Sequence, residues 1–266
     1  MGRKLGQHFL RSVPVLERIV ALADLAPGEA VLEIGPGRGA LTERLLAAGA
    51  RVTAIEIDPA LCAALRARWA GEPAFRLIEA DILRADLAPE TLFGAPEPYV
   101  VVANLPYYLS TPLLFRLMAE RERLARLVLM VQREIAERLL AVAGGGKDYG
   151  SLSICAQHAF LLRRGFIVPP GAFDPPPKVH SAVVALEPRR RQLAPEREAS
   201  FMAHIQRLFM NRRKLMLSNL RRLYPAAPAD WDDLARRVGQ ARAEVLTPAE
   251  HLAVFDAVAP EGPRGG

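Results

Sequence analysis

The run Asn104-Leu105-Pro106-Tyr107 carries residue types that can activate an amine attached to an aromatic ring. The lone pair of such an amine is delocalised into the ring, so the nitrogen is planar and weakly nucleophilic. Two hydrogen-bond acceptors, the Asn104 side-chain oxygen and the carbonyl of Leu105 or Pro106, can hold its N–H bonds and favour a tetrahedral nitrogen. Tyr107 can stack on a base turned out of its helix. The alternative is an ordinary tight turn, because Asn and Pro are common in turns.

A second aromatic candidate lies in the proline-rich run 173–181. Phe173 precedes Asp174 and three consecutive prolines, which stiffen the loop. We expect Phe173 to form the second face of an aromatic clamp on the base. The alternative is an apolar plug on a rigid loop.

Residues at the ends of three successive apolar runs are typical of a nucleotide-type cofactor site. Gly35 and Gly37 follow the first run, where a missing Cβ lets the backbone approach a ligand. Glu56 stands 21 residues after Gly35 and can accept hydrogen bonds from a ribose diol. Asp81 follows the third run and can accept from an adenine amino group. Each acid alone could equally be a helix cap.

The acid Glu33, just before the glycine turn, discriminates between cofactors. A dinucleotide carries a pyrophosphate, which prefers N–H groups and cations. S-adenosylmethionine carries a sulfonium cation and no phosphate, so it suits an acidic pocket. The sequence therefore favours S-adenosylmethionine. A nicotinamide oxidoreductase is an alternative, but the sequence has no Tyr-x-x-x-Lys motif for hydride transfer.

The elements that must position these residues alternate between strand-like and helix-like patterns. The expected strands are 30–34, 51–57, 75–79, 99–103, 127–131, 151–157 and 181–186. The expected helices between them are 41–48, 59–69, 111–120 and 133–142. Alternation of this kind predicts an α/β fold with a seven-stranded, mostly parallel, Rossmann-like sheet. After it we expect only helices, at 196–209, 213–223, 229–237 and 248–258. The expected division is a catalytic domain 1–187, a linker 188–195, a helical domain 196–259 and a disordered tail 260–266.

Positive charge is concentrated in one segment of the chain. The net charge is +6, and residues 189–224 alone hold ten Lys and Arg against two acids. This favours a phosphate-binding surface for RNA, although a solvated helix face or a composition rich in Arg would look similar. The candidate RNA-binding residues are Arg212, Arg213, Lys214, Arg221 and Arg222.

The composition also argues against a metalloprotein and a membrane protein. The two cysteines, Cys62 and Cys155, are too far apart in the sequence for a metal knuckle, and the histidines lack metal-ligand spacing, so we expect no metal site. No apolar run is long enough to span a membrane. We therefore expect a cytoplasmic monomer without a membrane partner.

These motifs occur together in an order that resembles the rRNA adenine N6,N6-dimethyltransferase family, in particular its bacterial small-subunit branch. The resemblance covers residues 3–255 and rests on Lys4, Gly6–Leu10, the Gly35 turn, Glu56, Asp81, Asn104–Tyr107, Gln132-Arg133-Glu134 and Phe173–Ser181. It implies a class I methyltransferase sheet and dimethylation of two adjacent adenosines near the 3′ end of 16S rRNA during ribosome biogenesis. It also implies that His8 and Leu10 contact the cofactor together with Gly35, Glu56, Asp81 and Asn104. Family members often have Asn at the position of His8 and Asn-Ile at Tyr108-Leu109.

Two other functions share much of this pattern. A large-subunit rRNA methyltransferase of the macrolide-resistance type has the same fold, although Leu105 and the run 173–178 favour the small-subunit enzyme. A binding protein that uses the methyltransferase fold without catalysis is the other, although the intact Asn104–Tyr107 motif argues against it.

Overall fold

The computed structural model describes residues 8–259, which form two compact units. The first comprises residues 8–136 and 160–190, and the second comprises residues 137–159 and 191–259. The expected disordered tail 260–266 lies outside the described residues. Within the described part of the chain, no helix has both the length and the apolar character needed to cross a bilayer.

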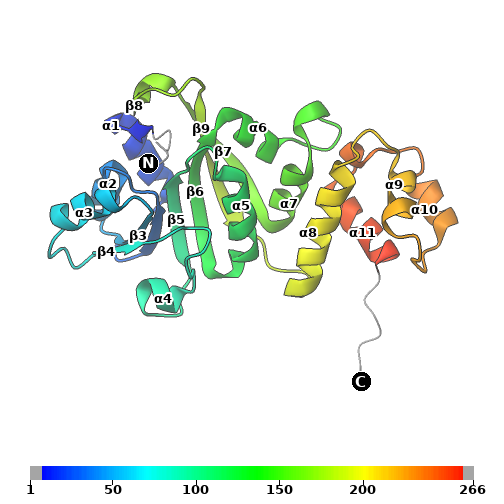
Figure 1. Cartoon of the computed structure of the whole chain (residues 1–266), viewed down its shortest axis with the longest axis horizontal. Helices are drawn as coiled ribbons and strands as arrows, with labels where there is room; N and C mark the ends of the chain where they lie inside the picture. Colours follow the sequence, from blue (N-terminus) through cyan, green and yellow to red (C-terminus); the bar gives the residue numbers. More distant parts are fainter. Residues whose placement is uncertain (1–7, 260–266) are drawn as a thin grey trace. The chain divides into compact units, whose positions relative to one another are not determined.

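The first unit is built on a seven-stranded sheet, as the alternating pattern predicts (Figure 1). Its strand order is β4-β3-β2-β5-β6-β9-β7. The strands are β2 (Ala30–Ile34), β3 (Arg51–Glu56), β4 (Phe75–Glu79), β5 (Tyr99–Asn104), β6 (Leu124–Gln132), β7 (Phe160–Val168) and β9 (Ser181–Pro188). The first five run parallel, and β9 is antiparallel to both β6 and β7. Strand β5, in the middle of the sheet, is apolar from Tyr99 to Ala103 because both of its faces are buried, and only Asn104 at its end is not fully buried.

The helices of this unit follow the strands. They are α1 (Val13–Ala23), α2 (Ala40–Ala47), α3 (Pro59–Arg68), α4 (Pro89–Phe93), α5 (Ser110–Ala119) and α6 (Arg133–Leu140), which continues into the second unit. Local chemistry fixes where α3 begins, because the Asp58 carboxylate accepts from the N–H groups of Ala60 and Leu61. The apolar faces of α1 and α2 pack against the sheet and form one core with β2, β5 and β6. The polar motifs lie at the carboxyl ends of the parallel strands, outside this core.

One expected strand is wrong. Residues 151–157 form part of helix α7 (Ser151–Ala159), and the seventh strand is instead β7. Helix α7 is buried on nearly every side, so its sequence lacks the polar face that marks an amphipathic helix. Strand β7 lies at the edge of the sheet and contains Arg163-Arg164-Gly165, which breaks the apolar pattern of a strand.

The second unit is built from helices, and besides the expected carboxyl-terminal segment it includes residues 137–159, which the sequence predicts to be part of the catalytic domain. Besides α7 it contains α8 (Pro195–Phe209), α9 (Met216–Leu223), α10 (Trp231–Val238) and α11 (Pro248–Val258). Leu208, Met216, Leu220, Leu234 and Val254 form the centre of its core. Helix α9 begins three residues later than expected because residues 211–214 form a turn, closed by the Lys214 N–H on the Asn211 carbonyl at 2.9 Å.

Candidate active site

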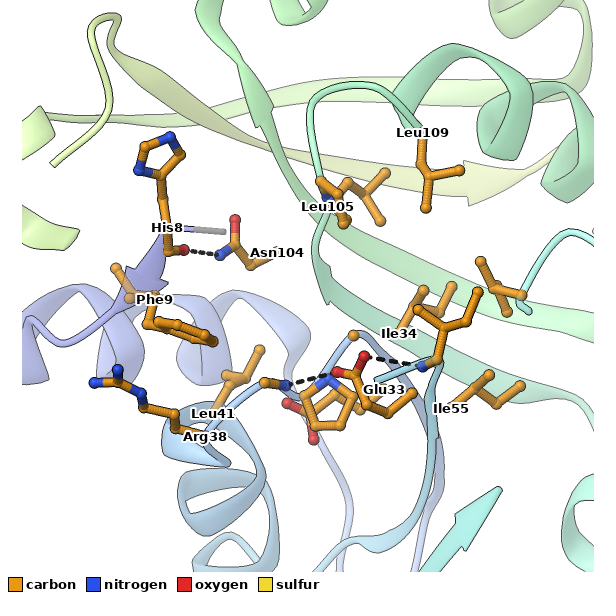
Figure 2. A pocket seen from close by; sticks show the side chains of 18 of the residues that line it. His8, Phe9, Glu33, Ile34, Arg38, Leu41, Ile55, Asn104, Leu105 and Leu109 are labelled. Carbon is orange, nitrogen blue, oxygen red and sulfur yellow. Dashed lines mark hydrogen bonds between the residues drawn. The ribbon is translucent and has the colours of Figure 1, made fainter. Parts of the chain in front are cut away.

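The motifs predicted at successive strand ends open onto one pocket in the first unit (Figure 2). The pocket is open to solvent, and its lining combines apolar side chains with a few polar groups, as is usual for a ligand site. Of the residues expected to bind the cofactor or act in catalysis, every one lines it: His8, Leu10, Gly35, Gly37, Glu56, Asp81, Asn104, Leu105, Pro106, Tyr107 and Phe173.

The glycine turn after β2 has a backbone that only glycine adopts easily. Gly35, Gly37 and Gly39 have φ values of 66°, 58° and 80°. A Cβ on Gly37 would lie 3.0 Å from the ring of Phe9, so this glycine also makes room for the amino-terminal segment. The turn therefore leaves room for a ligand and for the amino-terminal segment, which packs over it through Phe9.

The carboxylate of Glu56 is oriented by backbone N–H groups. Its Oε1 accepts from Ile57 at 2.9 Å and Asp58 at 3.1 Å, and its Oε2 accepts from Gly37 at 3.2 Å. Asp81 accepts from the Leu83 N–H at 2.9 Å. Both acids therefore shape the turns that follow their strands while they line the pocket.

A third acid, Glu33, lies under the pocket and is almost completely buried. The Thr42 hydroxyl donates to its Oε2 at 2.6 Å. Burial, with a smaller contribution from the charge of Glu56, raises the pKa of Glu33 to about 8. A cation in the pocket would favour the ionised form of this carboxyl.

The side chain of Asn104 is held by the amino-terminal segment. Its Nδ2 donates to the His8 carbonyl at 3.4 Å, and Figure 2 shows the two groups facing each other. Since the amide nitrogen is engaged, its oxygen remains as an acceptor for a ligand.

The turn after Asn104 has one carbonyl that is already occupied. The Pro106 oxygen accepts from the Leu109 N–H at 2.9 Å and from the Ser110 hydroxyl at 3.3 Å. The Leu105 N–H continues the sheet by donating to Met130 at 3.0 Å. Of the two carbonyls considered from the sequence, the one of Leu105 is therefore better suited to a ligand.

The aromatic candidates differ in exposure. Tyr107 is half-buried, and its hydroxyl lies 3.1 Å from the Ser181 hydroxyl, a contact that sequence reasoning missed. Phe173 is only 2% exposed and packs in the core while it lines the pocket.

A two-stranded sheet joins the amino-terminal segment to the proline-rich loop. Strand β1 (Phe9–Leu10) pairs antiparallel with β8 (Phe173–Asp174). Arg38 of the glycine turn lies over the Phe9 ring at 4.4 Å and forms an ion pair with Asp174 at 3.7 Å. The covering segment is thereby fastened to the loop that carries Phe173.

The candidate RNA-binding residues lie in the second unit and are of two kinds. Arg213, Lys214, Arg221 and Arg222 are exposed. The guanidinium of Arg212 instead pairs with Glu244 and donates to the carbonyls of Gly146 and Lys147, both at 2.6 Å. The positive charge of this segment does not by itself distinguish the exposed basic side chains from the one that is bound internally.

Comparison with known proteins agrees with the geometry of the pocket. A family model described as ribosomal RNA adenine dimethylase matches residues 1–259. The chain belongs to this family. The small-subunit rRNA methyltransferase A of Thermosynechococcus vestitus is 42% identical over 262 residues, which cover 96% of this chain and 95% of that protein.

Two solved structures of this kind share the fold. A dimethyladenosine transferase from Plasmodium falciparum superposes with a TM-score of 0.74 at 26% identity, covering 94% of this chain and 98% of the other. The 23S rRNA methyltransferase ErmE gives 0.68 at 29% identity, covering 94% and 99%. The expected class I methyltransferase fold is confirmed.

Proposed function

We propose that this protein transfers methyl groups from S-adenosylmethionine to N6 of two adjacent adenosines near the 3′ end of 16S rRNA, giving N6,N6-dimethyladenosine. The observation that carries the proposal is the position of Asn104–Tyr107. This run ends β5 and opens onto the same pocket as the acids at the ends of β2 and β3.

The pocket suits S-adenosylmethionine in its charge and backbone. The carboxylates of Glu56 and Asp81 line it, which favours a cationic ligand over a pyrophosphate. A cation there would also favour the ionised form of the buried Glu33. Glu56 would hold the ribose and Asp81 the adenine, and the glycine turn, His8 and Leu10 would contact the remainder of the cofactor. The bound cofactor would supply a methyl group on a positively charged sulfur, which is a good leaving group.

The protein's part in the reaction is to hold the amine. We propose that the Asn104 side-chain oxygen and the Leu105 carbonyl accept the two N6–H bonds and favour a tetrahedral nitrogen whose lone pair faces the donor. Tyr107 and Phe173 bracket the base, and the proline-rich loop fixes the position of Phe173. No strong general base is needed, so catalysis is mainly alignment and electrostatics.

Recognition of the RNA is assigned to the exposed basic side chains of the second unit. Arg213, Lys214, Arg221 and Arg222 are exposed, and Arg221 also lies over the Trp231 ring at 5.7 Å. The guanidinium of Arg212 is instead engaged by backbone carbonyls, which makes the exposed residues the better candidates for phosphate contacts. We further propose that the protein acts in the cytoplasm as a monomer on the small ribosomal subunit.

A large-subunit substrate is the second candidate, because ErmE, described as a 23S rRNA methyltransferase, has a similar structure. The relatives at about 40% identity over most of the chain are named small-subunit methyltransferases, which favours the first candidate.

The test is incorporation of tritiated methyl groups into unmethylated small and large subunits, followed by nucleoside analysis. We expect N6,N6-dimethyladenosine in the small subunit alone. Asn104→Ala should lower the rate by about 100-fold or more and leave RNA binding unchanged. Dimethyladenosine in the large subunit alone, or none in either, would overturn the proposal.

A further inference from the structure

We propose that Ser181 is a positioning residue for Tyr107. Its hydroxyl holds the tip of the tyrosine ring and so sets the surface on which the target base stacks. This inference rests on the proposed function, because it assigns Tyr107 to the base.

The contact joins a turn to one of the most firmly held parts of the sheet. The two hydroxyl oxygens lie 3.1 Å apart, although the residues are separated by 74 positions. Ser181 is completely buried, and its backbone pairs with Gln132 of β6 on one side and Val168 of β7 on the other. Tyr107, in contrast, belongs to the turn between β5 and α5. An anchor held by two neighbouring strands can therefore restrain a side chain on a less regular segment.

The residue type at position 181 is itself informative. The other residues of the buried run, positions 182–186, are all Ala, Val or Leu. A serine hydroxyl in such surroundings loses its hydration and needs a partner. Since either hydroxyl can donate to the other, the contact gives each of them one hydrogen-bond partner. An apolar residue would fit the strand at least as well, so the structure assigns the serine to its contact with Tyr107.

The segment that ends at Ser181 makes a second contact close to the Tyr107 ring, through the imidazole of His8. The His8 imidazole lies 5.9 Å from the Tyr107 ring, centroid to centroid, and its Nδ1 is 2.8 Å from the Pro175 carbonyl. The segment from Pro175 to Ser181 thus holds Tyr107 directly at its hydroxyl and holds the neighbouring imidazole at its edge. Without the hydroxyl pair, the ring keeps its stacking surface but loses the restraint on its orientation.

The test is a double-mutant cycle with Ser181→Ala and Tyr107→Phe, each of which removes one hydroxyl and keeps the aromatic ring. We expect each variant to lower the single-turnover methylation rate on unmethylated small subunits about 3- to 10-fold, the factor that one hydrogen bond supports. The double variant should be no slower than the single ones. The dissociation constant for S-adenosylmethionine should stay within about twofold, because the contact does not involve the acidic residues proposed to bind the cofactor.

A second readout needs no substrate. The chain has only five tyrosines, so the NMR signals of ring-labelled Tyr107 can be assigned by comparison with Tyr107→Phe. In Ser181→Ala we expect the Tyr107 ring signals to shift and its ring flips to become faster, with the other four tyrosines unchanged.

Ser153→Ala is the matched control. Ser153 is also completely buried, and its hydroxyl donates to the Arg138 carbonyl at 2.5 Å in the second unit. This variant should lose thermal stability yet keep the wild-type rate and the wild-type Tyr107 signals. A similar rate loss in Ser153→Ala would show that general destabilisation explains the effect.

Three results would overturn the inference: a wild-type rate in either single variant, additive losses in the double variant, or unchanged Tyr107 signals in Ser181→Ala. If Ser181→Ala does not fold, Tyr107→Phe decides alone, since a wild-type rate there excludes a role for the pair. If the wild-type protein itself does not methylate the subunits, the proposed function fails, and the NMR comparison still reports whether Ser181 holds the ring.

Discussion

Replacing Gly39 by alanine should cost the fold much more than the same change at Gly28. The two glycines have nearly the same backbone, with φ of 80° and 78°. A Cβ on Gly28 would meet nothing within 4 Å, whereas a Cβ on Gly39 would overlap the Trp69 ring, reaching its Cζ3 at 2.6 Å. The Trp69 ring cannot easily move away, because it packs against Phe75 at 5.0 Å and under the Arg68 guanidinium at 4.5 Å.

The magnitudes follow from these two situations. A non-glycine residue in the left-handed region costs about 1–2 kcal/mol, of which the stiffer unfolded chain returns about 0.4–1 kcal/mol, so Gly28→Ala should lose about 1 kcal/mol. Overpacking against Trp69 adds about 1–3 kcal/mol, which gives about 2–4 kcal/mol for Gly39→Ala. In a chain of this size, a loss of one kcal/mol lowers the midpoint of thermal unfolding by about 2–4 °C. The midpoint should therefore fall by roughly 2–4 °C in Gly28→Ala and by roughly 4–16 °C in Gly39→Ala.

The assay is thermal unfolding followed by circular dichroism and calorimetry on both variants at one pH. Trp69→Phe in the Gly39→Ala background should recover part of the loss, because the smaller ring leaves space for the new methyl group. Equal midpoints for Gly28→Ala and Gly39→Ala, or no recovery in the double variant, would refute the reasoning from the close approach of Trp69.

Three other predictions follow from buried or paired charges. Because burial raises the pKa of Glu33 to about 8, this residue favours the folded state below pH 4.5 and loses that contribution as the pH rises through 8. Urea titrations should therefore show that the free energy of unfolding of Glu33→Gln increases relative to that of the wild type as the pH rises across this range. A difference that does not change with pH would contradict this. Burial lowers the pKa of His204 to about 3 and of His251 to about 4, so stability should fall as the pH drops from 6.5 toward 4, and replacing both by Gln should flatten that profile. Arg212→Ala should cost about 2 kcal/mol in thermal unfolding because charge-assisted hydrogen bonds are lost, whereas Arg213→Glu should spare stability and weaken RNA binding more at 50 than at 200 mM salt. If Arg212→Ala instead spared stability and weakened RNA binding, Arg212 would be assigned to the RNA contact.

The sheet and the order of its motifs could be predicted because their signals are local. Residues 99–103 are a continuous apolar run, which is what burial on both faces of a parallel strand requires, and Asn104 follows at once. Glu56 likewise ends its own apolar run. Because the carboxyl ends of parallel strands meet at one edge, the local positions of these residues already place them together.

Two segments were misjudged because periodicity does not distinguish a short buried helix from a strand. Helix α7 has an apolar sequence without a polar face, and strand β7 carries Arg163 and Arg164 at an exposed edge. The pattern in each case reflects burial and not the type of element.

The contacts that orient the site could not be found from local sequence. The Asn104 amide is held by a carbonyl 96 positions away, and Tyr107 by a hydroxyl 74 positions away. Nor does a cluster of basic residues reveal that Arg212 is bound to carbonyls 65 and 66 positions earlier. Such pairs exist only once the chain has folded.

The pairing of β1 with β8 also sets a time order for synthesis. His8 contacts Pro175, 167 positions further along, so the amino-terminal segment emerges from the ribosome long before its partner strand has been made. At about 5–20 residues per second, the wait is roughly 8–33 s. Until then β1 lacks the strand that pairs with it and so helps to hold it beside the glycine turn and Asn104. A nascent chain stalled before residue 173 should therefore contain most of the parallel sheet and still be unable to assemble a complete methyl-transfer site.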